Sequence, residues 1–267
     1  MKVRLDQLML TRNLAESREK AKAMILANNV LVNNVPALKA GELVPLDCEI
    51  KLRGLEMKYV SRAGDKLDKA LTAFKIDVTN LVCLDIGSST GGFTDCLLQH
   101  NAKLVFAVDV GTNQLVWKLR QHSQVISLEK TNFRYATPSL FSEPIEFACC
   151  DVSFISLDKI LPPLKDILQP NHFSVVLIKP QFETTIEKVN QGKISDPTVH
   201  FETITKIINL ALTNDFSVLQ LDYSPILGNK KANIEFIALL QRTVNPVNHI
   251  SNEMIKNVIN TAWKKLK

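Results

Sequence analysis

The sequence predicts an α/β protein with a mostly parallel seven-stranded sheet, preceded by a small α+β domain. Two observations carry this prediction. Between residues 81 and 240, short apolar runs alternate with segments of helical periodicity, which is the pattern of a parallel sheet covered by helices. Three of the nine glycines fall within residues 87–92, directly after the first of these runs, where a strand must turn into a helix.

The first 58 residues predict a separate unit. Apolar residues between Leu5 and Leu14 have the spacing of a short amphipathic helix. Ser17 is placed to cap a second helix over residues 18–27, and the Asn-Asn pair that follows can end it. Short β segments are expected at residues 30–32 and 49–52. A unit of this size is too small for a deep pocket and suits docking on a larger surface.

Charge and composition narrow the function classes. The net charge is +5, with the basic excess in the first 40 residues and in the C-terminal tail, as expected if the ends touch phosphate. Ordinary solvated lysines explain the same charge equally well. No apolar run reaches 18 residues and the N-terminus lacks a signal-peptide pattern, so we expect no membrane span and a cytoplasmic protein. The five cysteines lack paired spacing, so we expect neither disulfides nor a metal site.

The second unit begins near residue 59, after a hinge-like stretch that follows Gly54. Ser61 is placed to cap a helix that runs through Phe74, with an apolar stripe on one face. Lys66 lies one position before the first leucine of that stripe. Its spacing alone favours a surface lysine.

The strongest local signal is the apolar run 81–86, followed by the glycine loop 87–92 and a helix from Phe93 to His100. Glycine lets the backbone approach a ligand closely, and such loops bind nucleotide-like cofactors at the carboxyl edge of a sheet. The spacing matches neither the dinucleotide pattern nor a phosphate-binding loop with lysine. It therefore favours a cofactor without phosphates, although a purely structural turn has the same composition.

Further strands are expected at residues 104–108, 125–128, 145–150, 173–178, 215–221 and 234–240, with helices at 157–168 and 199–212 among the connections. Charged residues follow four strands: Asp85, Asp109, Asp151 and Lys179. Because the carboxyl ends of parallel strands share one edge, we expect an active site there. Asp109, about 20 residues beyond the glycine loop, is placed to accept ribose hydroxyls or to cap the next helix.

Several stretches carry resemblances to known families. The N-terminal unit, through Arg4-Leu5-Asp6, Ser17-Arg18, Val32-Asn33 and Lys39, resembles the small α-L RNA-binding module of a ribosomal protein, pseudouridine synthases and tyrosyl-tRNA synthetases. The remainder, through residues 84–94, 151–156, 179–183 and 233–236, resembles FtsJ-like ribose 2′-O-methyltransferases. Together, residues 1–58 and 59–267 resemble the TlyA family of ribosomal RNA 2′-O-methyltransferases, often labelled haemolysins.

The resemblance implies a function and a site. The expected reaction is transfer of a methyl group from S-adenosylmethionine (SAM) to a cytidine ribose in 16S or 23S ribosomal RNA, with ribosomal subunits as partner and no obligate protein partner. The family's catalytic set maps to Lys66, Asp151, Lys179 and Glu235, with Lys179 as candidate base. The SAM site maps to Asp85, Gly87, Ser89, Gly91, Gly92, Phe93, Asp109 and Asn132. The RNA contacts are expected from Arg4, Arg12, Arg18, Lys20, Lys22, Lys39 and Arg62.

The sequence departs from the family pattern at two places, and two alternative functions remain open. The family usually has glycine where this chain has Ala232, and residues 228–231 are unusually basic, so the loop before Glu235 is expected to differ in shape. Residues 190–197 predict a mobile loop over the substrate or a long connector. The alternative functions are a membrane-active haemolysin and a non-catalytic RNA-binding protein.

Overall fold

The computed structural model describes residues 2–12, 14–15, 17–52, 58–228 and 232–266. It divides into two compact units, Met1–Lys58 and Tyr59–Lys267. The hinge expected after Gly54 and the basic stretch at 229–231 lie outside the described residues. Each unit is considered by itself.

The first unit packs two helices against short strands. Strands β1 (Lys2–Arg4) and β4 (Leu43–Pro45) pair antiparallel, and β2 (Val30–Val32) lies between β3 (Val35–Pro36) and β5 (Ile50–Leu52). Helices α1 (Leu5–Thr11) and α2 (Arg18–Leu26) bury their apolar faces in the same core. Ser17 caps α2 by accepting a hydrogen bond from the backbone of Lys20, as expected. Strands β1, β3 and β4 were not expected.

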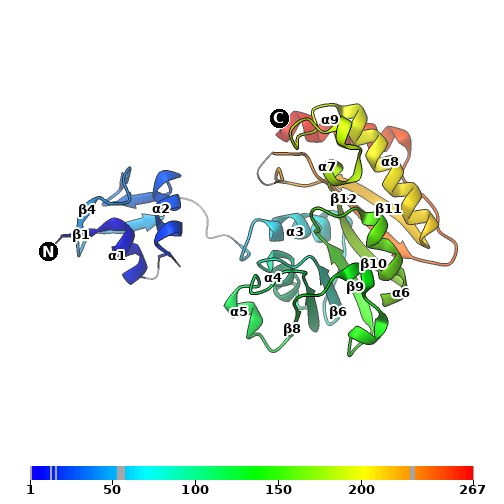
Figure 1. The fold of residues 1–267 in the computed structure, drawn as a ribbon, viewed down its shortest axis with the longest axis horizontal. Helices are drawn as coiled ribbons and strands as arrows, with labels where there is room; N and C mark the ends of the chain where they lie inside the picture. The colour runs from blue at the N-terminus through cyan, green and yellow to red at the C-terminus, as the bar shows by residue number, and fades with distance from the viewer. Residues whose placement is uncertain (1, 13, 16, 53–57, 229–231, 267) are drawn as a thin grey trace. The chain divides into compact units, whose positions relative to one another are not determined.

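The second unit contains the predicted sheet of seven strands, six of them parallel and one, β12, antiparallel to both neighbours. The order across the sheet is β11-β12-β10-β9-β6-β7-β8 (Figure 1). The strands are β6 (Val82–Ile86), β7 (Leu104–Val108), β8 (Val125–Leu128), β9 (Ile145–Cys150), β10 (Leu168–Ile178), β11 (Phe216–Tyr223) and β12 (Phe236–Arg242). Every residue of the central strand β6 is buried, as in a parallel sheet covered on both faces.

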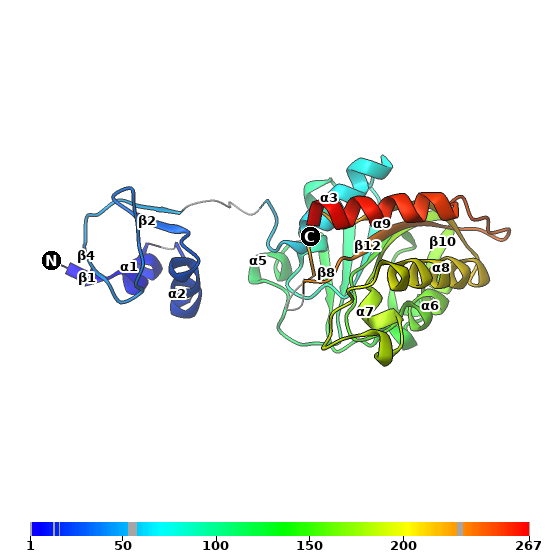
Figure 2. The same cartoon turned by 90° about the horizontal axis from the view of Figure 1, so that it is seen from above.

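Helices cover both faces of this sheet. One core joins the sheet to α6 (Leu161–Ile167), α8 (Pro197–Thr213) and α9 (Asn252–Leu266). A second core joins it to α3 (Ala63–Phe74) and α4 (Gly92–Gln99). Figure 2 shows strands β10 and β12 between α3 on one side and α6 and α8 on the other. The short helices are α5 (Trp117–Arg120), α7 (Pro180–Glu183), η1 (Phe133–Tyr135), η2 (Pro138–Leu140), η3 (Leu157–Lys159) and η4 (Ile186–Lys188).

Two expectations about helices were wrong, and one helix was not predicted. Helix α3 has Arg62 rather than Ser61 at its N-cap position, and no side chain caps it. The helix expected at 157–168 is split into η3 and α6, because the two prolines at the start of α6 fit a first turn but cannot continue an earlier one. The C-terminal segment, considered above only for its charge, forms α9 with Ile255, Ile259 and Ala262 buried.

The strand order reverses at β6, since β7 and β8 lie on one side of it and β9 and β10 on the other. In open α/β sheets, ligands bind beyond the carboxyl ends of the strands at such a reversal. The ends of β6, β9 and β10 therefore define where a site is expected. No described helix is long and apolar enough to cross a membrane.

Candidate active site

Four charged side chains converge beyond these strand ends. Asp151 follows β9, and its backbone N–H donates to the carbonyl of Ile86 at the end of β6, at 3.0 Å. Lys179 follows β10. Because β12 runs antiparallel to β10 and Phe236 pairs with Ile178, Glu235 enters the same edge from the opposite direction. Lys66 reaches it from the first turn of α3.

The four side chains form a continuous chain of ion pairs. Lys66 Nζ lies 3.1 Å from Asp151 Oδ2 and 2.7 Å from Glu235 Oε2. Lys179 Nζ lies 2.5 Å from Asp151 Oδ1 and donates to Ser153 Oγ at 3.0 Å. Each residue is buried or nearly so. The surface position that spacing favoured for Lys66 is therefore wrong, because the start of β12 brings Glu235 against α3.

The charge states of two members follow from this arrangement. Burial lowers the pKa of Lys66, but the carboxylates of Asp151 and Glu235 outweigh burial and the net pKa is raised. Burial raises the pKa of Asp151, but Lys66 and Lys179 outweigh it and the net pKa is lowered. Lys66 is therefore a cation and Asp151 an anion at neutral pH.

A cavity of about 440 Å³ opens onto this cluster. All four charged residues line it, together with Ser61, Arg62, Ser153 and the aromatic rings of Phe154 and Phe182. A second cavity of about 380 Å³ lies beside it and shares Gly87, Ser89, Asp151, Ser153 and Phe154 with the first. Both volumes are in the range of small-molecule sites. The shared walls make one two-part site, with the ion-pair cluster in the first part.

The second cavity contains most of the expected cofactor residues that reach a surface. Its lining includes Gly87, Ser89, Asp109 and Asn132, with Phe133, Val152 and Ile155 as apolar walls. Two carboxylates, Asp109 and Asp151, line it, and among the described residues no lysine or arginine does. A site with this charge disfavours a phosphate-bearing ligand and suits a cationic one.

The glycine loop is shaped by close packing within the chain. Gly87 and Gly91 have φ of +83° and +97°, the left-handed region that glycine favours. A Cβ at Gly91 would lie 2.4 Å from Leu119, and one at Gly92 would lie 2.3 Å from the hydroxyl of Ser61. These two glycines therefore let the loop pack against α5 and the start of α3. Gly87 and Ser89, two residues apart, line both cavities.

The acids near this loop hold different positions. Asp109 accepts backbone N–H groups from Ser89 at 2.8 Å and Gly111 at 2.7 Å, which ties the glycine loop to the end of β7. Each of its oxygens retains a second lone pair for a ligand. Asp85 is fully buried beneath the loop and lines neither cavity, so its direct contact with a cofactor stays a prediction. Phe93 is likewise a core residue, at the inner wall of the first cavity.

The sequence reasoning gave no role to Ser153, Phe154 or Phe182. Phe154 is 87% exposed and has φ of +62°, a conformation that costs energy for a bulky residue. Its ring lies 5.0 Å from that of Phe182, centroid to centroid, at the mouth of both cavities. The available signal was a large aromatic residue three positions after the acid at a strand end.

The loop at 190–197 is held by one buried amide. Asn233 accepts the N–H of Ile194 at 2.9 Å and donates to the carbonyl of Gly192 at 2.8 Å. Ala232, next to it, has φ of +51°. The position where the resembled family has glycine thus has a glycine-like backbone here too, which keeps Asn233 and Glu235 in register.

Three arginines of the expected RNA-binding set hold contacts within the first unit. Arg12 donates to the carbonyls of Cys48 at 2.7 Å and Leu46 at 2.6 Å. Arg4 and Arg18 both pair with Asp6, and hydrogen bonding from Arg4 holds the pKa of Asp6 down at about 2. The other members of the set are Lys20, Lys22 and Lys39 of the first unit and Arg62 of the second, and all four are exposed.

Comparison with known proteins agrees with this geometry. Residues 59–242 match the FtsJ-like methyltransferase family model, and residues 3–49 match the S4 domain model. A Mycobacterium tuberculosis protein named 16S/23S rRNA (cytidine-2′-O)-methyltransferase TlyA is 35% identical over 90% of both chains. The chain belongs to the TlyA family of FtsJ-like methyltransferases.

Other TlyA-family similarities cover nearly the whole chain. A Bacillus subtilis protein, YqxC, with a provisional name as an rRNA methyltransferase, is 45% identical over 100% of this chain and 96% of its own. A solved structure from Streptococcus thermophilus, provisionally named a haemolysin, superposes with a TM-score of 0.81 at 46% identity, over 99% and 96% of the two chains. The predicted α/β fold with an N-terminal S4 unit is thereby confirmed.

Proposed function

We propose that this protein transfers a methyl group from SAM to the 2′-hydroxyl of a cytidine in ribosomal RNA. The observation that carries the proposal is the Lys66–Asp151–Lys179–Glu235 cluster in one half of a two-part site, beside a cavity suited to the cofactor. The named activity of the TlyA relative, methylation of cytidine ribose in 16S and 23S rRNA, supports the choice of acceptor.

The second cavity fits SAM on its chemistry. When bound, SAM supplies a methyl group on a positively charged sulfur that departs as a neutral thioether. The carboxylates of Asp109 and Asp151 and the lack of a lysine or arginine among the described lining residues suit that charge. When bound, SAM would be held by the carboxylate of Asp109 at its ribose hydroxyls, by the backbone at Gly87 and Ser89, and by Asn132 and Phe133 beside the adenine.

Lys66 and Glu235 are assigned to orientation. Lys66 stays protonated because two carboxylates surround it, so it is not available to accept a proton. Its ammonium group joins Asp151 to Glu235, which holds both acids at fixed positions. Fixed donors and acceptors of this kind align an attacking oxygen with the methyl group, and alignment contributes a large part of the rate in a transfer reaction.

Lys179 is assigned as the base. In its unprotonated form the amine takes the proton of the ribose hydroxyl as the oxygen bonds to the methyl group. Asp151 and Ser153 position the amine at 2.5 and 3.0 Å. After the product leaves, the lysine returns its proton to water, and the cycle closes with one methyl group transferred and one proton released.

The experiment that tests this function is methyl transfer to separated ribosomal subunits. Subunits that lack the modification are incubated with the protein and SAM labelled in the methyl group, and labelled positions are mapped by 2′-O-methyl-sensitive sequencing. We expect label on a cytidine ribose in at least one subunit. No label in either subunit, in a preparation that binds SAM by calorimetry, would contradict the assigned acceptor.

A further inference from the structure

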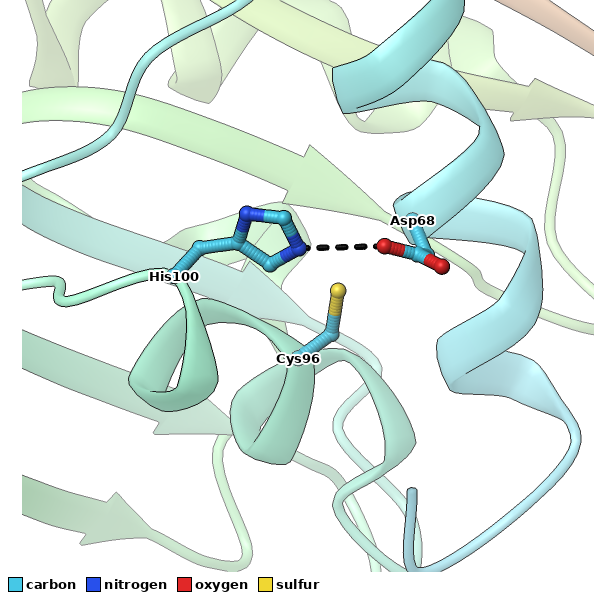
Figure 3. A group of neighbouring side chains, drawn as sticks. All are labelled: Asp68, Cys96 and His100. Atoms are coloured by element: carbon cyan, nitrogen blue, oxygen red, sulfur yellow. Dashed lines mark hydrogen bonds and ion pairs between the residues drawn. The ribbon is translucent and has the colours of Figure 1, made fainter. Parts of the chain in front are cut away.

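A second cluster of reactive side chains lies between α3 and α4, away from the lining of both cavities. Asp68 extends from α3, Cys96 from α4, and His100 from the position where α4 ends. Figure 3 shows the three side chains directed at one another across the gap between the helices. Cys96 and His100 are four residues apart and therefore lie on the same helix face.

The donor atoms converge on one point. His100 Nε2 lies 3.0 Å from Asp68 Oδ1, and one potential ligand atom from each of the three residues lies within 4.8 Å of the others. In Figure 3 the sulfur of Cys96 lies near the contact between the ring nitrogen and the carboxylate. A tetrahedral zinc ion with Zn–S and Zn–N bonds of usual length separates its ligand atoms by about 3.5 Å. Small side-chain adjustments therefore suffice.

The same geometry argues against a nucleophilic cysteine. In a cysteine–histidine–acid relay, the thiol and the carboxylate contact opposite nitrogens of the imidazole ring. Here the carboxylate contacts Nε2 and the sulfur lies on that side of the ring as well. A shared focus for thiol, imidazole and carboxylate is the arrangement of a metal site.

We propose that Asp68, Cys96 and His100 bind a zinc ion, with water as the fourth ligand. Sulfur, imidazole and carboxylate are the ligand types that zinc takes in proteins. Cys96 is fully buried in an apolar core, whereas the side chains of Asp68 and His100 are 25% and 34% exposed. The ion enters from the exposed pair, and the thiol gives its proton to solvent as the Zn–S bond forms.

The position gives such an ion a structural role. Asp68 lies two residues beyond Lys66, and α4 begins at the last glycine of the loop 87–92. A bond network through the metal joins the helix that carries Lys66 to the helix that follows the glycine loop. Binding therefore stabilises the relative placement of the two halves of the site, while both helices are already formed and packed without it.

Cobalt(II) is the probe that tests this site, because it occupies zinc sites and its thiolate bond gives an intense near-ultraviolet band. The full-length protein is stripped with chelator and titrated with Co²⁺, followed by displacement with Zn²⁺. We expect one Co²⁺ per chain, thiolate and tetrahedral bands, and their loss on adding Zn²⁺. The bands should be absent from Cys96→Ser. Binding should weaken by about 100-fold or more in His100→Ala, since even second-shell losses cost 10- to 100-fold.

His122→Ala, which removes an exposed histidine elsewhere, is the matched control and should bind as the parent does. His100 is partly exposed, so His100→Ala decides the question even if a change at buried Cys96 impairs folding. Spectra of octahedral, water-ligated cobalt in the parent protein would overturn the proposal. So would thiolate bands that survive unchanged in both Cys96→Ser and His100→Ala.

Discussion

Asp85 is the residue whose burial has the clearest measurable consequence. It lies within the buried strand β6, where Thr94 donates to one carboxylate oxygen at 2.6 Å and the other oxygen has no hydrogen-bond partner among the described residues. Burial, together with the nearby charge of Asp151, raises its pKa to about 7. A folded-state pKa above the unfolded value means that the folded protein keeps the proton while the unfolded chain loses it.

This difference in proton binding makes the free energy of unfolding depend on pH. Below pH 4 both states are protonated and stability is unaffected. Between pH 4 and 7 the free energy of unfolding falls as pH rises, by an amount on the order of 4 kcal/mol. Asp85→Asn removes this titration, so the difference in unfolding free energy between parent and variant should change across that window, measured by urea denaturation. Parallel pH curves for the two proteins would contradict the buried, proton-binding carboxyl.

Phe154 is the second residue with a specific expectation. A strained, exposed aromatic at the mouth of the site suits stacking on an unpaired base, a contact that contributes about 1–3 kcal/mol per base. Phe154→Ala should therefore raise KM for RNA about 5- to 150-fold, with SAM affinity little changed. Phe173→Ala, which removes a partly exposed ring on β10, serves as the control. An unchanged KM in Phe154→Ala would rule out the stacking role.

For single residues, the sequence predicted which charged residues lie at strand ends, but it did not predict which side chains contact one another. Asp109, Asp151 and Lys179 could be placed at strand ends because the apolar runs stop before them. The burial of Lys66 could not, since it depends on Glu235, which is 169 residues further along the chain. Local spacing carries no information about which distant strand will lie against a helix.

At the scale of elements, the backbone at Ala232 fixes the entry of β12. The left-handed conformation costs a residue with a Cβ about 1–2 kcal/mol relative to glycine. Ala232→Gly should relieve that cost, less the added entropy of a glycine in the unfolded chain, and stabilise the protein by up to about 1 kcal/mol. Urea denaturation measures the change.

Ala73→Gly is the matched control, because Ala73 is an exposed residue within α3. There the same substitution should destabilise by about 1 kcal/mol. Equal destabilisation by both changes would show that Ala232 does not hold a glycine-like conformation in solution.

The elements themselves were largely predictable, and the exceptions have physical causes. Apolar runs located all seven strands of the large sheet, and helical patterns located α3, α4 and α8. The two adjacent prolines predict the break between η3 and α6. The spacing of Ile255, Ile259 and Ala262 is typical of an amphipathic helix and predicts α9. The prediction was missed because only the charge of this segment was considered. The antiparallel direction of β12, by contrast, depends on the path of the chain through space.

At the scale of the whole molecule, we expect the S4 unit to contribute RNA binding and the methyltransferase unit to contribute catalysis. The exposed Lys22 and Lys39 are expected to contact phosphate, whereas Arg12 is used to hold two backbone carbonyls within its own unit. Each of Lys22→Ala and Lys39→Ala should weaken RNA binding and reduce the salt slope of log K by about 1.

Arg12→Ala distinguishes a role in the stability of the first unit from a role in RNA binding. It should lower the thermal stability of the first unit, because two carbonyls lose their donors, while Lys22→Ala and Lys39→Ala leave melting unchanged. Filter binding over a range of salt concentrations and thermal melting followed by circular dichroism measure the two effects. A salt slope that does not change in either lysine variant would remove these residues from the RNA interface.

The proposed role of the cluster around Lys179 in methyl transfer is tested by the single-turnover rate of Lys179→Ala on ribosomal RNA. SAM binding is measured in parallel by calorimetry, with the exposed Lys103→Ala as control. We expect a rate lower by about 100-fold or more, as for loss of a general base, with SAM affinity retained and the control unaffected. Near-normal turnover in Lys179→Ala would contradict it.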